Sequence, residues 1–431
     1  QPKFLSALQP IIFENFRPVR QFTFYPYAAA NYDSIRHESD LKSGFDIFWR
    51  PSSNHQLTAA VNPDFGNIES DDVVVNLTSI ETFFPEKRPF FLEGQEIFTT
   101  TPRAQSRGRG TPTILVNTRR IGSPPIAPAS ENIDANQLTE LIGAAKITGQ
   151  KNRWRYGFLT AIEEDTNIKG RQDNQDIDLK ADGRTFGAAR LLHESTTRGG
   201  RRGLGWITTM VDHPTRNAKV HGIDGHYLSG NGAWNVDGQF LYSDVNGSKG
   251  LGGFADITYA PEDGYKHKLA LNYFDDDLDI NDFGFMRRNN AITARYNFEL
   301  TQSNVPGLKE RETSVTLSQE YNTDGLVVRS GVFLKQEREF DDNNELEIEL
   351  NYFPARWDDL SSRGNGSFRV NPRWSAGISW STDDAKQLHA TFEYSFEDEE
   401  LFGNKRSYGM ELNWQPADRL SAQMSIFYKK R

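Results

Sequence analysis

Residues 388–397 read LHATFEYSFE, and apolar and polar side chains alternate along this stretch without a break. The apolar members are Leu388, Ala390, Phe392, Tyr394 and Phe396. Because successive side chains of a β-strand point to opposite faces, the stretch predicts a strand with one apolar and one polar face. Strands of transmembrane β-barrels have this pattern, and so do strands of soluble β-sandwiches.

The same alternation recurs along the chain, for instance at residues 345–352 and 420–428. Many of these stretches run for about 10 to 14 residues, longer than the usual five or six and long enough for tilted membrane crossings. Roughly twenty of them are too many for one sandwich and suit a large barrel. We therefore predict an all-β fold, a large antiparallel transmembrane β-barrel of about 20 or more strands.

Composition agrees with this prediction and excludes other classes. Mean hydropathy is -0.66, and no apolar run approaches the ~18 residues of a membrane-spanning helix. A barrel also looks polar on average, because only every second strand residue faces lipid. The formal net charge of -10 argues against a nucleic-acid partner. We expect a chain of the bacterial outer membrane, in contact with its lipid.

The turns supply a more specific signal. An aromatic residue ends one strand, a short polar turn follows, and a return strand begins at once in Trp49–His55, Tyr259–Gly264, Trp414–Arg419 and, without proline, Trp380–Asp384. Short turns beside an aromatic girdle are typical of the periplasmic side of a barrel. Longer polar connections are expected on the outer side, at 165–182, 275–288, 356–365 and 397–405.

This alternation of sides predicts an inner segment. Strand 53–62 is expected to ascend, and a strand at about 112–121 must also ascend if strand 140–149 descends. The chain then has to return between them through charged residues, which are tolerated at membrane depth only inside protein or a watery lumen. We predict first barrel strands in 1–63, a lumenal plug or constriction in 64–111 and the remaining strands in 112–431. The alternative is an unrecognised strand at Val73–Ser79.

Charged and aromatic side chains of this segment are the candidate site. Buried charges need partners on the plug or on the wall. One interpretation is a structural ionic lock, and the other is a constriction that selects solutes, as in porins. The candidate lumen residues are Asp64, Glu69, Asp71, Asp72, Glu81, Glu86, Lys87, Arg88, Glu93, Arg119, Arg120, Arg287 and Arg288. The aromatic plug residues are Phe83, Phe84, Phe90 and Phe91, interpreted as plug core or, alternatively, as a sugar-stacking surface.

A family resemblance rests on the same region. The motif runs from Val61-Asn62-Pro63-Asp64-Phe65-Gly66 to Glu81-Thr82-Phe83-Phe84-Pro85-Glu86-Lys87-Arg88-Pro89-Phe90-Phe91-Leu92-Glu93-Gly94, with shorter matches at 118–122, 143–149 and 284–289. It resembles an uncharacterised family of bacterial outer-membrane β-barrels that follow a domain similar to family-nine carbohydrate-binding modules. The resemblance implies an outer-membrane location and, by analogy, an oligosaccharide as solute. It also leads us to expect that the chain is a fragment with strands missing.

Other motifs are weaker. The aspartates of 275–282 resemble a calcium loop, but Ile280 stands where an EF-hand needs glycine, so a solvated outer loop is favoured and neither metal nor cofactor is assigned. His389 and Glu393 share the polar face of one strand, without a hydrolase motif beside them. No catalytic residue is assigned, and an enzyme is disfavoured.

Three functional hypotheses remain. The leading one is a porin-like barrel for the passage or capture of a polar solute. The second is a non-conducting structural barrel that anchors or displays a protein partner, and the third is an outer-membrane hydrolase.

Overall fold

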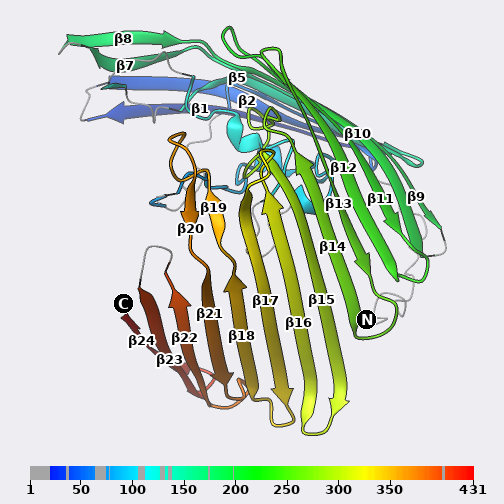
Figure 1. Cartoon of the computed structure of the whole chain (residues 1–431). Helices are drawn as coiled ribbons and strands as arrows, with labels where there is room; N and C mark the ends of the chain where they lie inside the picture. Colours follow the sequence, from blue (N-terminus) through cyan, green and yellow to red (C-terminus); the bar gives the residue numbers. More distant parts are fainter. Residues whose placement is uncertain are drawn as a thin grey trace. The chain divides into compact units, whose positions relative to one another are not determined.

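The computed structural model describes residues 20–34, 38–63, 74–76, 78–104, 112–126, 132–133, 138–172, 175–197, 199–399 and 403–431 (Figure 1). The chain divides into two compact units. The first unit comprises residues 1–227, 237–253 and 275–289, and the second comprises 228–236, 254–274 and 290–431. Each unit is built from long antiparallel strands, and nineteen strands of the described residues are assigned to one sheet.

In the first unit the wall strands pair as neighbours in the order β1, β2, β3, β5, β6, β9 and β10, all antiparallel. Their bounds are β1 Gln21–Asp33, β2 Glu38–Ser52, β3 His55–Val61, β5 Leu141–Lys151, β6 Trp154–Glu163, β9 Thr185–Thr197 and β10 Gly200–Asp212. A small separate sheet joins β4 Asn132–Ile133, β7 Thr166–Gln172 and β8 Gln175–Ala181. Three further strands contain residues of both units: β11 Ala218–Leu228, β12 Trp234–Val245 and β13 Ser248–Tyr259.

In the second unit β14 to β18 and β21 to β24 lie side by side in chain order (Figure 1). Their bounds are β14 Tyr265–Phe274, β15 Ala291–Val305, β16 Leu308–Tyr321, β17 Val327–Phe340, β18 Glu345–Phe353, β21 Arg373–Ser381, β22 Leu388–Asp398, β23 Asn404–Ala417 and β24 Leu420–Lys430. Between β18 and β21, β19 Arg356–Asp358 and β20 Phe368–Val370 form a hairpin.

The predicted alternation of faces is present in both units. Large apolar side chains stand exposed on one face, which we call the outer face; Phe158 is 47% exposed and Phe392 is 48% exposed. In the first unit the intervening side chains are buried on the inner face, where Leu159 is 1% exposed. An exposed apolar face on strands of this length is the face that a bilayer covers. The all-β, outer-membrane barrel class predicted from residues 388–397 is therefore confirmed.

The predicted sorting of turns is also present. Short turns join β2 to β3, β5 to β6 and β23 to β24. The opposite strand ends carry the long connections, including the β7–β8 hairpin within 165–182 and the β19–β20 hairpin near 356–365. At the tip between β5 and β6, Asn152 has φ +56, a left-handed conformation that asparagine tolerates better than most residues.

One strand prediction was wrong. Within residues 112–121 only Ile114 forms a β-bridge, and η4 Thr118–Arg120 is a 3₁₀ turn. β3 pairs directly with β5, so the chain needs no further wall strand between them. The described residues 74–76 and 78–79 contain no strand either, whereas residues 73 and 77 lie outside the described residues.

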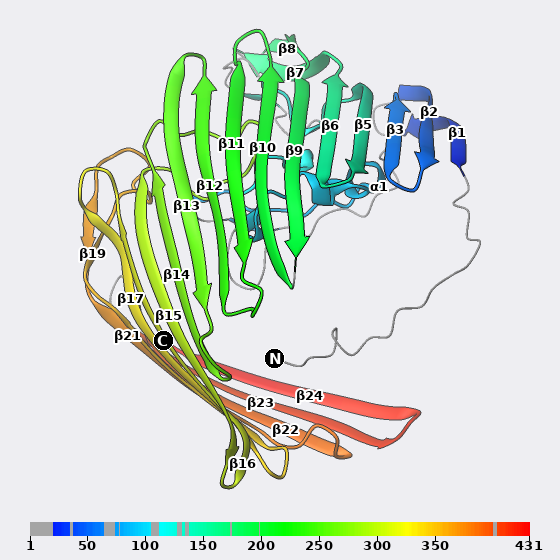
Figure 2. The ribbon, with the colours of Figure 1, turned by 90° about the vertical axis from the view of Figure 1, so that its right-hand side faces the viewer.

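The residues between β3 and β5 instead carry short helical turns. These are α1 Pro89–Leu92, η2 Gln95–Ile97 and η3 Pro102–Ala104, followed by η4. No helix of the described residues is both long enough and apolar enough to span a membrane. We call residues 78–104 and 112–126 the inner segment; Figure 2 shows α1 and its flanking turns behind β6 and β9.

Candidate functional site

The inner segment packs on the inner face of the first unit. Phe90, Phe91, Ile97 and Phe98 are all at most 5% exposed. A Cβ added at Gly157 of β6 would lie 2.8 Å from Ile97 and 2.9 Å from Phe98, so the missing side chain lets the segment approach the wall. Each fully buried side chain of this size contributes about 1.5–3 kcal/mol. The segment is thus a second apolar layer over this wall.

A buried ion pair lies inside the inner segment. Arg88 contacts both carboxylate oxygens of Glu86 and donates to the carbonyl oxygen of Ile121 at 2.8 Å and to that of Thr118. The Thr118 hydroxyl donates to Glu86 at 2.6 Å. Burial opposes ionisation of Glu86, but the hydrogen bonds and charge of Arg88 and the Thr118 hydroxyl outweigh it and hold the pKa of Glu86 below its ordinary 4.5. This contact joins the two halves of the segment.

A buried lysine of the wall holds the helix α1. Lys146 of β5 is 2% exposed. Its ammonium group donates to the carbonyl oxygen of Phe90 at 2.6 Å and to that of Glu93. The ammonium nitrogen also lies 5.4 Å from the centre of the Phe90 ring. A buried charge is costly unless it is paired, so these carbonyl groups are what makes Lys146 tolerable.

A second wall pair holds the end of the inner segment. Glu163 and Arg184 form a bidentate contact at 2.7 and 2.9 Å. Glu163 also accepts the backbone N–H of Gly122 at 2.7 Å, and Arg184 donates to the carbonyl oxygen of Ser123 at 3.0 Å. The pair therefore satisfies its own charges and fixes the chain where it leaves the inner face.

The connection 275–289 also packs against the inner segment. Ile114 and Phe285 exchange backbone hydrogen bonds of 2.9 and 2.8 Å, and the Phe83 ring lies 5.1 Å from the Phe285 ring. Arg120 binds Glu81 at 2.7 and 2.8 Å and donates to the Gly284 carbonyl at 3.2 Å. The expectation of a solvated outer loop fails here, because its apolar side chains are buried: Leu278, Ile280, Phe283 and Phe285.

The aspartates of this connection have protein partners. Arg216 binds Asp282 at 2.6 and 3.0 Å and Asp279 at 2.7 Å, and Asp275 accepts the backbone N–H of Leu251 at 2.6 Å. The described residues contain no group of three or more histidine, aspartate or glutamate side chains arranged to hold a metal ion.

The other predicted site residues are spread around these contacts. Lys87 is half-buried and donates its backbone N–H to Glu86 at 2.9 Å, and Phe84 is half-buried as well. Arg119 is half-buried, and burial lowers its pKa. Arg287 and Arg288 are half-buried in the connection 275–289. Asp64, Glu69, Asp71 and Asp72 lie outside the described residues.

One buried network of the first unit was missed by the sequence analysis. Arg190 of β9 binds Asp224 of β11 through both carboxylate oxygens, one of them at 2.7 Å. His226 bridges Asp224 at 2.8 Å and Asp237 at 2.7 Å. Arg190 and Asp224 side chains are 1% and 0% exposed. The signal was present, since these charges occupy inner positions of three strands, but only the register brings them together.

The inner face of the second unit is polar and half-exposed. Glu312, Glu337 and Glu347 are successive cross-strand neighbours on β16, β17 and β18. Lys335 lies between two of them, in contact with Glu337 and 3.0 Å from Glu347. The next row toward the short turns consists of Glu310, Glu339 and Glu345. Like charges placed directly opposite destabilise a sheet, so packing alone does not account for these rows.

The geometry of His389 and Glu393 does not support the hypothesis of a hydrolase. His389 places Nδ1 2.6 Å from the carbonyl oxygen of Thr382 and Nε2 3.3 Å from the Thr391 hydroxyl. Both ring nitrogens thus face groups of its own hairpin, while Glu393 lies four residues further along the same strand. The pair is therefore not arranged as a base and its orienting carboxylate.

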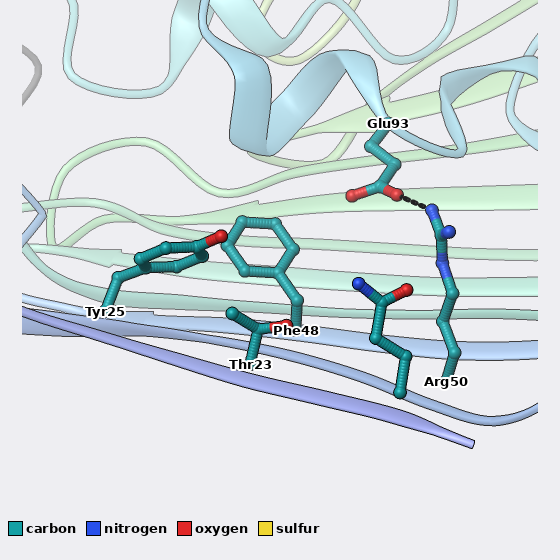
Figure 3. Close-up of a pocket in the computed structure, with 6 residues that line it drawn as sticks. Thr23, Tyr25, Phe48, Arg50 and Glu93 are labelled. Carbon is teal, nitrogen blue, oxygen red and sulfur yellow. Dashed lines mark hydrogen bonds and ion pairs between the residues drawn. The ribbon is translucent and has the colours of Figure 1, made fainter. Parts of the chain in front are cut away.

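A pocket opens on the inner face of β1 and β2, with a volume of about 200 Å³. Figure 3 shows Thr23, Tyr25, Phe48 and Arg50 beneath Glu93 of the inner segment, and the dashed line marks the ion pair between Arg50 and Glu93. Gln21 completes the lining. Tyr25 is 57% exposed, and its ring meets that of Phe48 edge-on at 5.8 Å.

The chain matches one protein family along nearly its whole length. The family is described as a domain of unknown function, DUF5916, and its model matches residues 17–431. The chain belongs to this family. The predicted membership of an uncharacterised family is thereby confirmed, and that family is DUF5916. No curated protein matches the chain.

Solved structures resemble the DUF5916 domain distantly. The siderophore receptor PirA from Acinetobacter baumannii has 9% identity and a TM-score of 0.42, over 90% of this chain and 66% of that one. The ferric enterobactin receptor PfeA from Pseudomonas aeruginosa has 9% identity and a TM-score of 0.42, over 95% and 75%. A FadL homologue from Pseudomonas aeruginosa has 11% identity and a TM-score of 0.20, over 72% and 74%. Likenesses this distant carry no inference about a ligand.

Proposed function

We propose that the DUF5916 domain is an outer-membrane barrel for the passage or capture of a polar solute. The observation that carries the proposal is the inner face of the second unit, where charged side chains are half-exposed instead of covered. Glu337 and Glu347 side chains are 43% and 41% exposed, and Lys335 is 39% exposed. A polar inner face opposite an apolar outer face is typical of strands that line a water-filled lumen.

The excess of carboxylates on this face predicts which ions the domain prefers. Rings and rows of acidic side chains favour cations in pores. On β16 to β18 the two glutamate rows contain six carboxylates, and Lys309 and Lys335 are the lysines bound to them. We therefore propose that ions carried through the domain are mainly cations. The proposed solute class, an oligosaccharide, rests on analogy with the family resemblance.

The inner segment has the role of a plug or constriction in this proposal. Its charges are paired with one another or with the wall, as in Glu86–Arg88 and Glu81–Arg120. This supports the ionic-lock interpretation more than the selective-constriction one, because paired and buried charges are not available to a solute.

The same anchoring supports a second candidate function. A segment held by Lys146, Glu163 and Arg184 is fixed in place, and a barrel filled by a fixed segment is suited to a non-conducting role. In that role the protein would anchor or display a protein partner.

Conductance in planar bilayers tests the proposal. The pairing of Val61 with Gly143 allows residues 64–140 to be replaced by a short glycine-containing loop that turns β3 and β5 into a hairpin. We expect larger current from this variant than from the full chain, with a reversal potential that indicates cation preference. Glu312→Gln combined with Glu337→Gln should weaken that preference. Ser330→Ala, on the outer face of β17, is the matched control.

The absence of current from both the full chain and the shortened chain would remove the passage hypothesis and favour the non-conducting barrel. If the glutamate substitutions leave the ion preference of the current unchanged, the inner face of the second unit does not line the conducting path. Deleting residues 64–111 alone provides a second shortened chain, which retains the Glu163–Arg184 anchor.

A further inference from the structure

The pocket beneath Glu93 is formed by one face of a two-stranded ladder. Gln21 is the cross-strand neighbour of Arg50, and Thr23 is the neighbour of Phe48. Because side chains alternate along a strand, Gln21, Thr23 and Tyr25 stand on the same face. Phe22 and Phe24 point the other way, to the outer face, and are 65% and 49% exposed. The pocket therefore belongs to the inner face, with the inner segment as its roof.

The charges of the pocket cancel. Arg50 and Glu93 are the charged residues of the lining and form an ion pair with each other. An anion entering the pocket would have to compete with Glu93 for Arg50, and a cation would have to compete with Arg50 for Glu93. The pair is half-exposed and leaves the pocket without net charge, so the site offers no unpaired charge to an ionic ligand and suits a neutral one.

The polar lining offers donors and acceptors together. The Gln21 amide, the Thr23 hydroxyl and the Tyr25 hydroxyl can each donate and accept, Arg50 donates, and Glu93 accepts. A sugar hydroxyl likewise donates and accepts at once. A ligand with several hydroxyl groups around one ring can satisfy this mixed set, whereas an aliphatic ligand would leave it unsatisfied.

Tyr25 provides the apolar surface of the site. More than half of the residue is exposed, and Phe48 contacts the Tyr25 ring edge-on with an interplanar angle of 77°. Aromatic rings combine a large apolar face with little conformational freedom to lose, which suits them to stack on the C–H face of a sugar. The volume of about 200 Å³ fits one ring more than a drug-sized ligand.

We propose that this pocket binds one ring of a neutral saccharide, stacked on Tyr25, with its hydroxyl groups on Gln21, Thr23, Arg50 and Glu93. The proposal rests on the proposed function and gives it a place where an oligosaccharide is held. It makes Tyr25 the residue that contributes most to affinity, and the Arg50–Glu93 pair the group that leaves the site without net charge.

Isothermal titration calorimetry on the full chain tests the proposal. The protein is held in lauryldimethylamine oxide, because a detergent with a sugar headgroup would compete. The probes are maltohexaose, cellohexaose and xylohexaose, with ferric enterobactin as a charged, aromatic comparison. We expect at least one hexasaccharide to bind, and Tyr25→Ala to weaken its binding about ten-fold or more, which corresponds to about 1.4 kcal/mol. Tyr25→Phe keeps the stacking face and should stay within about three-fold.

Phe24→Leu is the matched control, because it changes an aromatic residue of the same strand on the outer face and should leave affinity unchanged. The proposal is overturned if none of the three hexasaccharides binds, if Tyr25→Ala binds as the unchanged chain does, or if only ferric enterobactin binds. Conductance keeps the two proposals apart. Saccharide binding without current leaves the pocket and removes passage, whereas current without saccharide binding leaves passage and removes the pocket.

Discussion

The inner faces of the two units differ in how far their charged side chains are buried and paired. In the first unit charged side chains of the wall, such as Lys146 and the Arg190–Asp224 pair, are buried and paired beneath or beside the inner segment. In the second unit Glu312, Glu337 and Glu347 are opposed to one another and half-exposed. Charged side chains of the first inner face are therefore buried and bonded within the protein, whereas those of the second are exposed to water.

The comparison implies different energetic costs for the same kind of substitution. Removing one member of a buried pair leaves the other charge desolvated without compensation. Removing one member of a half-exposed pair leaves a charge that water still solvates, so little stability is lost.

The largest effect is expected at the buried network of the first unit. Asp224→Ala leaves Arg190 without its carboxylate and removes one of the two carboxylates that His226 contacts, and should lower the free energy of unfolding by about 3–5 kcal/mol. Urea unfolding in detergent micelles, followed by tryptophan fluorescence, measures it. Glu337→Gln in the second unit is the control and should cost less than about 1 kcal/mol. Equal losses would break the comparison.

The next effect is expected where the wall holds α1. Lys146→Met keeps the length of the side chain but leaves the carbonyl groups of Phe90 and Glu93 without their donor, at a cost of about 1.5–3 kcal/mol. Hydrogen exchange of backbone amides in 90–98 should accelerate about ten-fold or more. Lys335→Met should leave exchange in these residues unchanged, and acceleration by both substitutions would contradict local anchoring.

A pH effect of intermediate size is expected from Glu86. Its pKa in the folded chain lies below 4.5, so its contribution to stability is fully present above the unfolded pKa and is lost as the pH falls through the folded value. Unfolding midpoints measured between pH 3 and 6 should fall below about pH 4.5. Glu86→Gln should flatten this part of the profile, whereas the half-exposed Glu81→Gln should leave it in place. An unchanged profile in Glu86→Gln would assign the acid sensitivity to another group.

The smallest effect is expected at Lys335. Lys335→Met leaves Glu337 and Glu347 facing each other without the cation between them, which should cost up to about 1 kcal/mol. Because these charges are half-exposed, 1 M KCl should restore most of the loss. Asp224→Ala should not be rescued by salt, and rescue of both variants would mean that the two inner faces do not differ in burial.

The strands were predictable because their signal is local. The alternation in 388–397 needs no knowledge of partners, and the short turns at Trp49–His55 and Trp414–Arg419 mark the strand ends. The strand predicted at about 112–121 was wrong for a different reason. It was inferred from the alternation of sides, which counted a wall strand between β3 and β5, whereas these two strands pair directly.

The candidate site was predictable only in part. The motif 81–94 indicated an inner position for Phe90, Phe91, Glu86 and Arg88, and those residues are buried or paired. Its partners Lys146, Glu163 and Arg184 stand on strands that only pairing registers bring beneath the motif. The acidic connection 275–282 was assigned to solvent on its charge, although Ile280 in its middle is 1% exposed.

The pairing of β3 with β5 has a consequence for how the chain folds. Val61 lies opposite Gly143, so the β3–β5 pairing closes a loop that contains residues 62–142. Most neighbouring strand pairs close only a tight turn. Closing a long loop is entropically costly, and contacts distant in sequence form slowly. We therefore expect the β3–β5 pairing to form late in the folding of the wall. These strands can pair only after the inner segment between them has packed on the inner face.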